Sequence, residues 1–581
     1  MKKIKLPSEE KKHLNYFPAE SNRKYNNTQN LYEYLLEKNK NHFDEIAITF
    51  GNLKITYEEM HNNIDKYARA LYKKGVRKGD IIGLCLANTP EAIYLFYAIN
   101  KLGAITCQLN PTDNAFKLMK DLEIVKPKMI ITINDCYKNI KKAKNDLNVN
   151  IETIVFPAVQ SVDNELVKVL YGFKQIISGN ALYNINNSLK KLLDDALNYN
   201  EIIEYPKYEP NTLSNIVFTG GSSGTHKGVD LSSNGLNNLM DAYSYFNLLN
   251  PGDVFMGHLP TFMGFGILAL HYALCTNTNL NLTFKALPKD FISELDRIHP
   301  AAAFGGPIHW ETFIDNPQAL KLDLRHLKEP VSGGEQLVLD KWLKINKILE
   351  KCNAPTSLWN GLGMSEMWSA SALNRGNVNT VGTVGVVYPC NNVKIIDMNS
   401  EKELGYGKIG RYCVTGPSMM LGYHNNPKET NKVIKPDENG TRWLETGDIA
   451  KISENGEITF MGRTKRCFVS GVTNIYPEQI EDIVNKIDGI KQIIVTHVQF
   501  DGNQNVPIYH VRLDEKYTNQ DKVSKAIRNS ILKTLGNPAL PYDIVYTYDE
   551  LPVTKNGKLD PKPLQEVDNY KYSKTLIKKG R

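Results

Sequence analysis

The segment FTGGSSGTHKG, residues 218–228, has the composition in this sequence that most clearly suggests chemistry. Its hydroxyl side chains include those of Thr219, Ser222 and Ser223. A turn this rich in glycine can point several amide N–H groups and hydroxyls at one anion, and Lys227 would add a positive charge. It is not a Walker A sequence, because the lysine follows a histidine and precedes a glycine. Composition therefore favours a polyphosphate-binding loop over a flexible surface loop.

Alternating apolar strands and helices are predicted in the surrounding sequence. Residues 81–87, IIGLCLA, form a continuous apolar strand, and Thr89-Pro90 begins a helix that Gly103 ends. The next apolar run, AITCQL, completes a strand–helix–strand unit. Unbroken apolar strands that alternate with helices are typical of parallel sheets covered on both faces. We therefore predict the α/β fold class, with a large N-terminal domain of parallel sheets flanked by helices.

Two further units are predicted toward the C-terminus. Between residues 394 and 460 the helical pattern disappears, and short strands with glycine turns indicate a β subdomain. After Arg463 a helix that starts at proline, two strands and another helix indicate a small α+β domain. The predicted units are an N-terminal arm (1–28), the large domain (29–462) with its β subdomain (about 385–462), the small C-terminal domain (463–567) and a loose basic tail (568–581).

Composition excludes several classes of protein. Of 581 residues 41% are apolar, which is too many for a disordered chain, and a net charge of +7 is too small to indicate a nucleic-acid-binding surface. The eight cysteines include no CxxC pair, so we predict neither a zinc ribbon nor a disulfide framework. We therefore expect the protein to be located in the reducing cytoplasm. The N-terminus lacks the apolar region of a secretory signal, and the longest apolar stretch, 259–274, is too interrupted to span a membrane.

The glycine-rich segment resembles a known signature. It is similar to [YF]TSGSTGxPKG, the phosphate loop of the acyl-adenylate-forming ligases, which include acyl-CoA synthetases, aryl-acid ligases, luciferases and peptide-synthetase adenylation domains. Further segments resemble motifs of this family in the same order: SGGEQL, NGLGMSE, GRYCVTGPSMMLGYHNNPKET, LETGDIA, GRTKRCFVSGVTNIYPEQIE and LPVTKNGKL. The resemblance runs from about residue 30 to 565. It implies an AMP-forming enzyme that activates a carboxylic acid with ATP.

The resemblance also implies roles for individual residues. The nucleotide-binding residues would be Thr219, Ser222, Ser223, Gly224, Gly334, Glu335, Asn360, Leu362, Ser365, Asp448 and Arg463. Among them, Asp448 would accept hydrogen bonds from both ribose hydroxyls, and Arg463 would reach the ribose or the α-phosphate. Glu366 would bind Mg²⁺, which prefers oxygen ligands. Lys558 would neutralise charge between the carboxylate and the α-phosphate, so the implied catalytic residues are Lys558, Glu366 and Lys227.

A second half-reaction with a thiol is implied as well. Lys558 and its domain would cover the acyl carbon during adenylation, so the small domain would have to rotate, and Lys465 occupies the hinge position of the family. Gly471 would then face the acyl group, where the missing side chain leaves room for a pantetheine arm. The expected cofactors are ATP and Mg²⁺, together with CoA or the phosphopantetheine of a separate carrier protein.

Several positions depart from the family pattern. Gly220 replaces a serine and His226 replaces a proline, and Leu362 replaces the tyrosine that lies on the adenine ring. The missing aromatic pair predicts ATP binding weaker by about 0.5–1.5 kcal/mol. Met263 stands where acyl and aryl ligases carry histidine and amino-acid-activating domains carry aspartate. Without that carboxylate an α-ammonium would be buried unpaired, so we expect an acid with an apolar body.

The acyl pocket and the final acceptor are less sharply predicted. Candidate pocket residues are Phe262, Met263, Gly306, Trp359 and Gly361; the alternative is that Phe262 and Met263 are ordinary core. The first functional hypothesis is a ligase that converts a fatty or aryl acid into acyl-AMP and pyrophosphate and then transfers the acyl group to CoA. The second is a stand-alone adenylating enzyme that loads a carrier protein or an amine. The third is a degenerate member that binds nucleotide without turnover.

Overall fold

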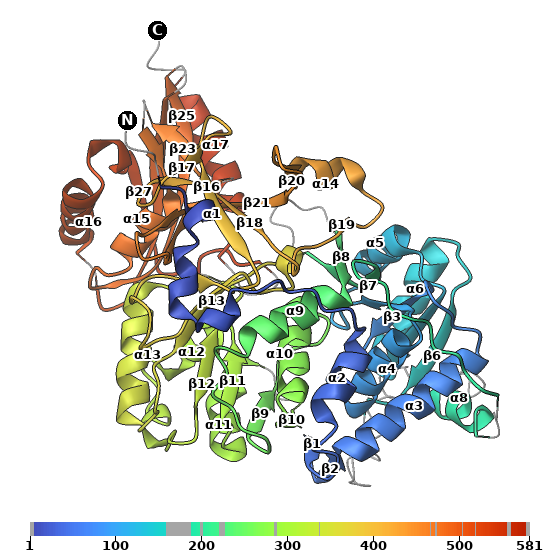
Figure 1. Cartoon of the computed structure of the whole chain (residues 1–581). Coiled ribbons are helices and arrows are strands. Elements are labelled where there is room, and N and C mark those ends of the chain that lie inside the picture. The colour runs from blue at the N-terminus through green and yellow to red at the C-terminus, as the bar shows by residue number, and fades with distance from the viewer. Residues whose placement is uncertain are drawn as a thin grey trace.

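Two mainly parallel sheets form the body of the molecule (Figure 1). The computed structural model describes residues 5–158, 188–197, 201–219, 227–283, 287–335, 337–464, 466–470, 473–501, 504–517, 519–554 and 559–576. The first sheet runs, in spatial order, through β19 (Gly422–Tyr423), β8 (Gly228–Ser232), β7 (Leu213–Phe218), β4 (Ile105–Gln108), β3 (Ile81–Cys85), β5 (Met129–Ile133) and β6 (Glu152–Phe156). The second sheet runs through β15 (Val386–Val387), β14 (Ala372–Asn374), β13 (Trp359–Leu362), β12 (Glu329–Ser332), β11 (Ala302–Gly305), β9 (Val254–Gly257), β10 (Asn279–Leu282), β1 (Ile46–Phe50) and β2 (Leu53–Thr56).

The helices pack against these sheets as the alternating pattern predicts. The first sheet is flanked by α4 (Pro90–Lys101), α5 (Ala115–Val125), α6 (Asn134–Asp146) and α8 (Leu189–Asp195), whereas α3 (Tyr57–Lys73) contacts α4, α8 and the second-sheet strands β1 and β2. Near the second sheet lie α2 (Leu31–Asn39), α9 (Ser233–Tyr243), α10 (Gly264–Cys275), α11 (Phe291–Ile298), α12 (Pro307–Trp310) and α13 (Leu339–Lys351). Local signals set their starts: the Thr89 hydroxyl accepts from the Ala92 N–H, and Pro90 occupies the first turn of α4. The predicted α/β class is confirmed.

Both sheets share one apolar core. Ile82 of the first sheet and Phe255 of the second belong to the same cluster of buried side chains, and both are at most 1% exposed. Ligands of open α/β sheets bind at the carboxyl ends of the parallel strands. In the described part of the chain, no helix combines the length and apolar character needed to cross a lipid bilayer.

An antiparallel sheet forms the unit predicted as a β subdomain. It contains β17 (Glu403–Leu404), β16 (Asn392–Ile396), β18 (Ile409–Thr415), β21 (Arg442–Ile452) and β20 (Ile434–Pro436), and β22 (Ile458–Arg463) pairs with β21. The expectation that this region lacks helices is wrong at α14 (Pro427–Val433). Asn426 caps that helix by accepting from the Glu429 N–H, and Pro427 occupies its first turn, so the local signal was present.

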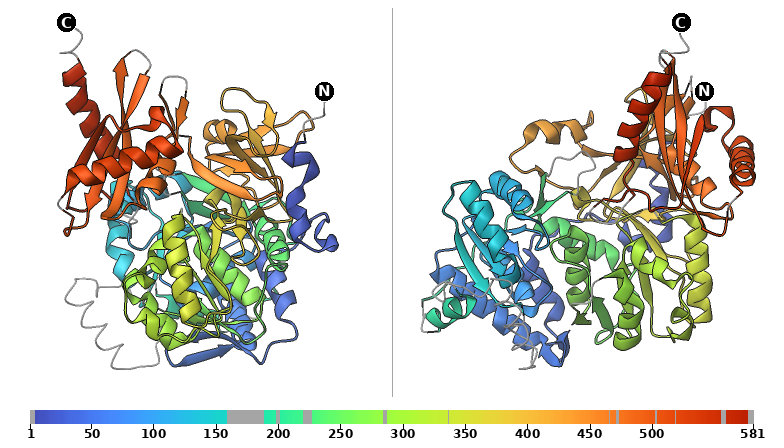
Figure 2. Two further views of the ribbon diagram at one scale, coloured as in Figure 1. Left: turned by 90° about the vertical axis from the view of Figure 1, so that its left-hand side faces the viewer. Right: turned by 180° about the vertical axis from the view of Figure 1, so that it is seen from behind.

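The C-terminal unit has its own core. The paired strands β23 (Phe468–Ser470) and β24 (Thr473–Ile475) accompany a sheet of β25 (Ile490–Asp501), β26 (Gln504–Leu513) and β27 (Asp543–Thr547), with helices α15 (Pro477–Val484), α16 (Gln520–Thr534) and α17 (Lys562–Leu576). In Figures 1 and 2 this unit and the antiparallel sheet lie at one end of the molecule, next to the two large sheets.

Helix α17 differs from the predicted basic tail. It continues through the boundary expected at residue 567, so residues 568–576 are helical instead of loose. Asp568 is only 1% exposed and lies 2.7 Å from His510 Nε2 on β26. The basic composition of the tail concealed this anchor, because a single buried carboxylate changes composition very little.

The N-terminal arm follows the body closely. It contains α1 (Pro7–Glu10), η1 (Lys12–Tyr16) and η2 (Ala19–Ser21). The Ser8 hydroxyl donates to Glu403 Oε2 of the antiparallel sheet at 2.8 Å, and the Asn27 N–H donates to Asn238 Oδ1 of α9 at 2.9 Å. The arm therefore ties the antiparallel sheet to the large domain.

Candidate functional site

The predicted phosphate loop joins two antiparallel strands of the first sheet. The Thr219 N–H donates to the Lys227 carbonyl oxygen at 3.0 Å and continues the ladder of β7 and β8. Gly228 is closely packed, because a Cβ there would lie 3.1 Å from His424 Cβ and 3.2 Å from Ile216 Cγ2. This hairpin fixes Thr219 and Lys227 at the two ends of the loop. The loop residues 220–226, with the predicted contacts of Ser222, Ser223 and Gly224, lie outside the described residues.

Lys227 is paired with a carboxylate in this structure. Its Nζ lies 2.6 Å from Glu429 Oε2 on α14 and 4.5 Å from the centroid of the Tyr423 ring. The ammonium groups of Lys227 and Lys432 lower the pKa of Glu429 to about 2. Two residues that are 202 positions apart in the sequence thus form an ion pair. An incoming anion would have to compete with Glu429 for the Lys227 ammonium.

Glu366 faces the same tyrosine from a different loop. It lies in η7 (Ser365–Met367), and the Tyr423 hydroxyl donates to its Oε1 at 2.8 Å. Gly363 allows the backbone of this loop to approach Ser369. A Cβ at residue 363 would lie 1.9 Å from the Ser369 carbonyl oxygen, so only glycine fits. The site therefore contains an oriented carboxylate, which is the type of ligand that Mg²⁺ prefers.

Asp448 is a buried carboxylate with unused acceptor capacity. It lies on β21 opposite Arg463 of β22 and is 1% exposed. Arg463 Nε lies 2.8 Å from Oδ1, but within the described chain no group donates an aligned hydrogen bond to either carboxylate oxygen. Burial raises the pKa of Asp448 to about 6, with Arg463 lowering it and the Glu366 carboxylate raising it again. A hydroxylated ligand could therefore donate hydrogen bonds to this carboxylate beside Arg463.

The predicted adenine-side residues lie at the carboxyl ends of neighbouring strands. Gly334 and Glu335 follow β12, whereas Asn360 and Leu362 belong to β13, which pairs with β12 in parallel. Gly334 has φ +85°, a backbone conformation that favours glycine at this turn. Asn360 is 6% exposed and Leu362 is half-buried at the border of the apolar core. The topology thus brings two distant motifs to one edge of the sheet.

The candidate acyl-pocket residues have mixed environments. Met263 precedes α10 and is 43% exposed, so the alternative that it is ordinary core is wrong, whereas Phe262 is half-buried. Gly306 follows β11, and Gly361 lies two residues beyond Trp359 on β13. Trp359 is 1% exposed and its Nε1 donates to Thr356 Oγ1 at 3.0 Å, which anchors the indole in the core.

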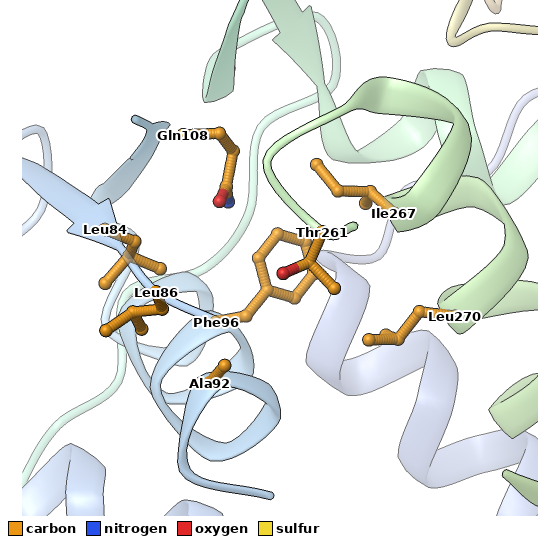
Figure 3. Close-up of a pocket in the computed structure, with 8 residues that line it drawn as sticks. All are labelled: Leu84, Leu86, Ala92, Phe96, Gln108, Thr261, Ile267 and Leu270. Atoms are coloured by element: carbon orange, nitrogen blue, oxygen red, sulfur yellow. The ribbon is translucent and has the colours of Figure 1, made fainter. Parts of the chain in front are cut away.

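A small apolar pocket adjoins the segment that carries Phe262 and Met263 (Figure 3). Side chains from two strands of the first sheet, from α4 and α10 and from the adjoining loops line it: Leu84, Leu86, Ala92, Phe96, Gln108, Thr261, Ile267 and Leu270. Ile267 and Leu270 lie on α10, one and two turns after the predicted pocket residues. The sequence did not indicate this pocket, because its walls come from segments more than 150 positions apart.

Other predicted residues lie outside the described parts of the chain. These are Gly220, His226, Lys465, Gly471 and Lys558. Their roles remain predictions. Conversely, Tyr423 and Glu429 contact Lys227 and were not among the predicted site residues. Both lie in the stretch GYHNNPKET that resembles a family motif, which was the available signal.

Comparison with known proteins decides the family. The family model described as AMP-binding enzyme matches residues 35–424. The chain belongs to the AMP-binding enzyme family. This confirms the resemblance that the ordered motifs indicate.

The chain is similar to curated acid–CoA ligases and to solved structures over three quarters or more of its length. It is 25% identical to a long-chain-fatty-acid–CoA ligase of Bacillus subtilis over 91% of this chain and 93% of that protein. It is 27% identical to a probable 4-coumarate–CoA ligase of Dictyostelium discoideum over 76% of this chain and 78% of that protein. ATP-bound MatB from Rhodopseudomonas palustris matches with a TM-score of 0.77 and 21% identity, covering 93% of this chain and 99% of that one. The anthranilate CoA ligase AuaEII bound to anthranoyl-AMP matches with a TM-score of 0.78 and 18% identity, covering 94% and 98%.

Proposed function

We propose that this AMP-binding enzyme activates a fatty or aryl acid with ATP, forms acyl-AMP and pyrophosphate, and transfers the acyl group to CoA. The observation that carries the proposal is the buried Asp448 carboxylate, whose two oxygens receive no aligned hydrogen bond among the described residues, opposite Arg463 and electrostatically coupled to Glu366. Buried carboxylate oxygens that receive no aligned hydrogen bond cost stability, so they suit a hydroxylated ligand. The relatives named above are acid–CoA ligases, which supports the same reaction.

The adenylation step needs charge stabilisation more than covalent participation by the protein. A carboxylate oxygen of the acid attacks the α-phosphorus of ATP, the new O–P bond forms and the bond to pyrophosphate breaks. Lys227 and the amides of the 219–227 loop would stabilise the departing charge, and Asp448 would hold the ribose. When bound, Mg²⁺ would neutralise phosphate charge, and the oriented carboxylate of Glu366 suits it as a ligand. Lys558 would approach the reacting carboxylate and α-phosphate.

The acid is proposed to have an apolar body. Met263 supplies no carboxylate for an α-ammonium, and it is the residue that precedes α10. Ile267 and Leu270, on the helix that follows Met263, line the small pocket of Figure 3 with aliphatic side chains. An acyl chain or aryl ring placed along α10 would meet apolar surface there.

The thiol half-reaction is proposed to follow rotation of the C-terminal unit about Lys465. Two arginines bracket that residue and belong to different units. Arg463 pairs with Asp448 of the antiparallel sheet, whereas Arg466 lies 3.1 Å from Glu478 of α15. Arg463 thus has its ion pair on the side of the antiparallel sheet and Arg466 on the side of the C-terminal unit, which supports a border between them.

The test is an assay of the purified protein with ATP, Mg²⁺, CoA and a panel of fatty and aryl acids, in which pyrophosphate and thioester are measured separately. We expect acid-dependent release of pyrophosphate and CoA-dependent formation of thioester. Pyrophosphate without any CoA consumption would support the second hypothesis, a carrier protein or amine as acceptor. Absence of both products for every acid would contradict the proposal and favour a nucleotide-binding member without turnover.

A further inference from the structure

Tyr423 contacts two groups that act on different parts of the nucleotide in the proposed reaction. Its ring centroid lies 4.5 Å from Lys227 Nζ, and its hydroxyl donates to Glu366 Oε1 at 2.8 Å. Lys227 lies next to β8 and Glu366 lies in η7. Because they belong to different elements, the backbone hydrogen bonds of one element do not set the distance between them. The tyrosine is 8% exposed, which shields both contacts from water and strengthens them.

The backbone of Tyr423 is itself held in place. It forms β19 with Gly422 and pairs with Val229 of β8, two residues after Lys227. Its N–H also donates to Thr430 Oγ1 of α14 at 2.8 Å. The same helix supplies Glu429, which holds the Lys227 ammonium at 2.6 Å. The Tyr423 ring therefore has a fixed position between Lys227 and Glu366.

We propose that Tyr423 is a positioning residue for adenylation, which orients the Glu366 carboxylate through its hydroxyl and holds the Lys227 ammonium over its ring. The inference rests on the proposed function. A hydrogen bond to one carboxylate oxygen fixes the rotation of the carboxylate and so the direction of the other oxygen. The cation–π contact limits the positions of the flexible lysine stem. Together they keep the two charges at a constant separation.

Two substitutions separate the two contacts. Tyr423→Phe removes the hydroxyl but keeps the ring, so we expect the Mg²⁺ concentration that half-saturates ATP binding to rise about 10-fold. ATP binding measured in excess chelator should stay unchanged in this variant. Tyr423→Leu removes the ring as well and should also weaken metal-free ATP binding by about 2- to 5-fold. Isothermal titration calorimetry without acid measures both quantities independently of turnover.

The chain contains a matched control far from the site in sequence. The Tyr34 hydroxyl donates to Asp241 Oδ1 at 2.8 Å, and Lys38 Nζ lies 4.8 Å from the Tyr34 ring centroid. Tyr34→Phe therefore removes an equivalent hydrogen bond and should lower the melting temperature to a similar extent without changing the Mg²⁺ requirement. In a Glu366→Gln background, Tyr423→Phe should add no further effect, because the coupled partner is already changed.

The outcomes are distinguishable. An unchanged Mg²⁺ requirement in Tyr423→Phe, or an equal change in Tyr34→Phe, would overturn the inference. If the wild-type protein binds Mg²⁺ and ATP but releases no pyrophosphate with any acid, the proposed function fails, while calorimetry still decides the role of Tyr423. If the wild-type protein binds no ATP at all, both proposals fail.

Discussion

At the scale of single residues, two buried carboxyl groups carry unusual protonation behaviour. Asp448 belongs to the candidate site, whereas Glu329 starts β12 in the second sheet. The Leu248 N–H donates to Glu329 Oε1 at 2.6 Å, and the Tyr272 hydroxyl lies 3.0 Å from both carboxylate oxygens. Burial nevertheless dominates and raises the pKa of Glu329 to about 8. A neutral carboxylic acid is thus part of the core near neutral pH.

Glu329→Gln should change how stability depends on pH. Between about pH 4.5, the ordinary carboxyl pKa, and pH 8, the folded protein keeps a proton that the unfolded chain releases. This group therefore makes stability fall as pH rises through that window, by up to about 1.4 kcal/mol per pH unit. The variant lacks the titrating group, so its stability relative to wild type should increase from pH 5 to pH 8 in urea unfolding. A pH-independent difference between the two proteins would contradict this assignment.

Leu362→Tyr should strengthen ATP binding. Leu362 ends β13 at the edge where the adenine ring is predicted, and a tyrosine there would add an aromatic pair worth about 0.5–1.5 kcal/mol. The measurement is the KM for ATP in the pyrophosphate assay. Leu362→Phe should give the same gain, because the ring and not the hydroxyl stacks. An unchanged KM in both variants would show that the adenine does not lie against this residue.

At the scale of elements, the N-terminal arm stabilises the junction between the antiparallel sheet and the large domain. The Phe17 ring lies 5.1 Å from Phe246 and 6.5 Å from Tyr245, centroid to centroid. Phe17 is 9% exposed, although the arm is mostly polar in sequence. A single aromatic side chain thus anchors a segment that a hydropathy pattern would leave on the surface.

Phe17→Ala should destabilise the arm by about 3 kcal/mol, because it removes a buried aromatic ring. We expect faster hydrogen exchange over residues 5–30 and earlier proteolysis there, measured by mass spectrometry. Phe116→Ala is the matched control, since Phe116 is 64% exposed and its loss should change stability by at most about 0.5 kcal/mol. Equal protection of the arm in both variants would contradict the anchoring role.

At the scale of the whole molecule, the proposed reaction depends on how two units meet. Arg466 Nη2 lies 2.5 Å from Glu481 of α15, whereas Arg463 completes the ladder of β22 with β21. Gly462 lies close to Glu478 of the C-terminal unit, where a Cβ would be 2.5 Å from the Oε2 atom. The chain therefore passes from one unit to the other within a few residues, and β22 also contacts α15 of the C-terminal unit.

Lys558→Ala tests whether the C-terminal unit takes part in adenylation. We expect the rate of acid-dependent pyrophosphate release to fall by about 100-fold or more, because a charge that is used only in the transition state is removed. Thioester formation from preformed acyl-AMP should persist, since that step would use another orientation of the unit. Lys555→Ala, from the same sequence segment, is the control and should be nearly neutral. Equal loss of both half-reactions in Lys558→Ala would contradict the division of labour.

Sequence by itself determined the class of fold and the family. The alternation of apolar strands and capped helices follows from the local preference of each segment, so it can be read without the tertiary structure. The ordered motifs are likewise a property of the sequence alone. The same local signals placed β13 and the loop between β7 and β8 in the candidate site. Where one buried group outweighed composition, as at Asp568 in α17, the pattern misled.

Only the tertiary structure decided which charges meet. Segments far apart in the chain meet in two of these contacts: Lys227 pairs with Glu429, and the Tyr423 hydroxyl donates to Glu366. The fold also buries Asp448, whose oxygens receive no aligned hydrogen bond among the described residues. Electrostatic energy depends on distance and burial in space, and a sequence lists neither. The chemistry could therefore be named from the residues, whereas their working arrangement required the fold.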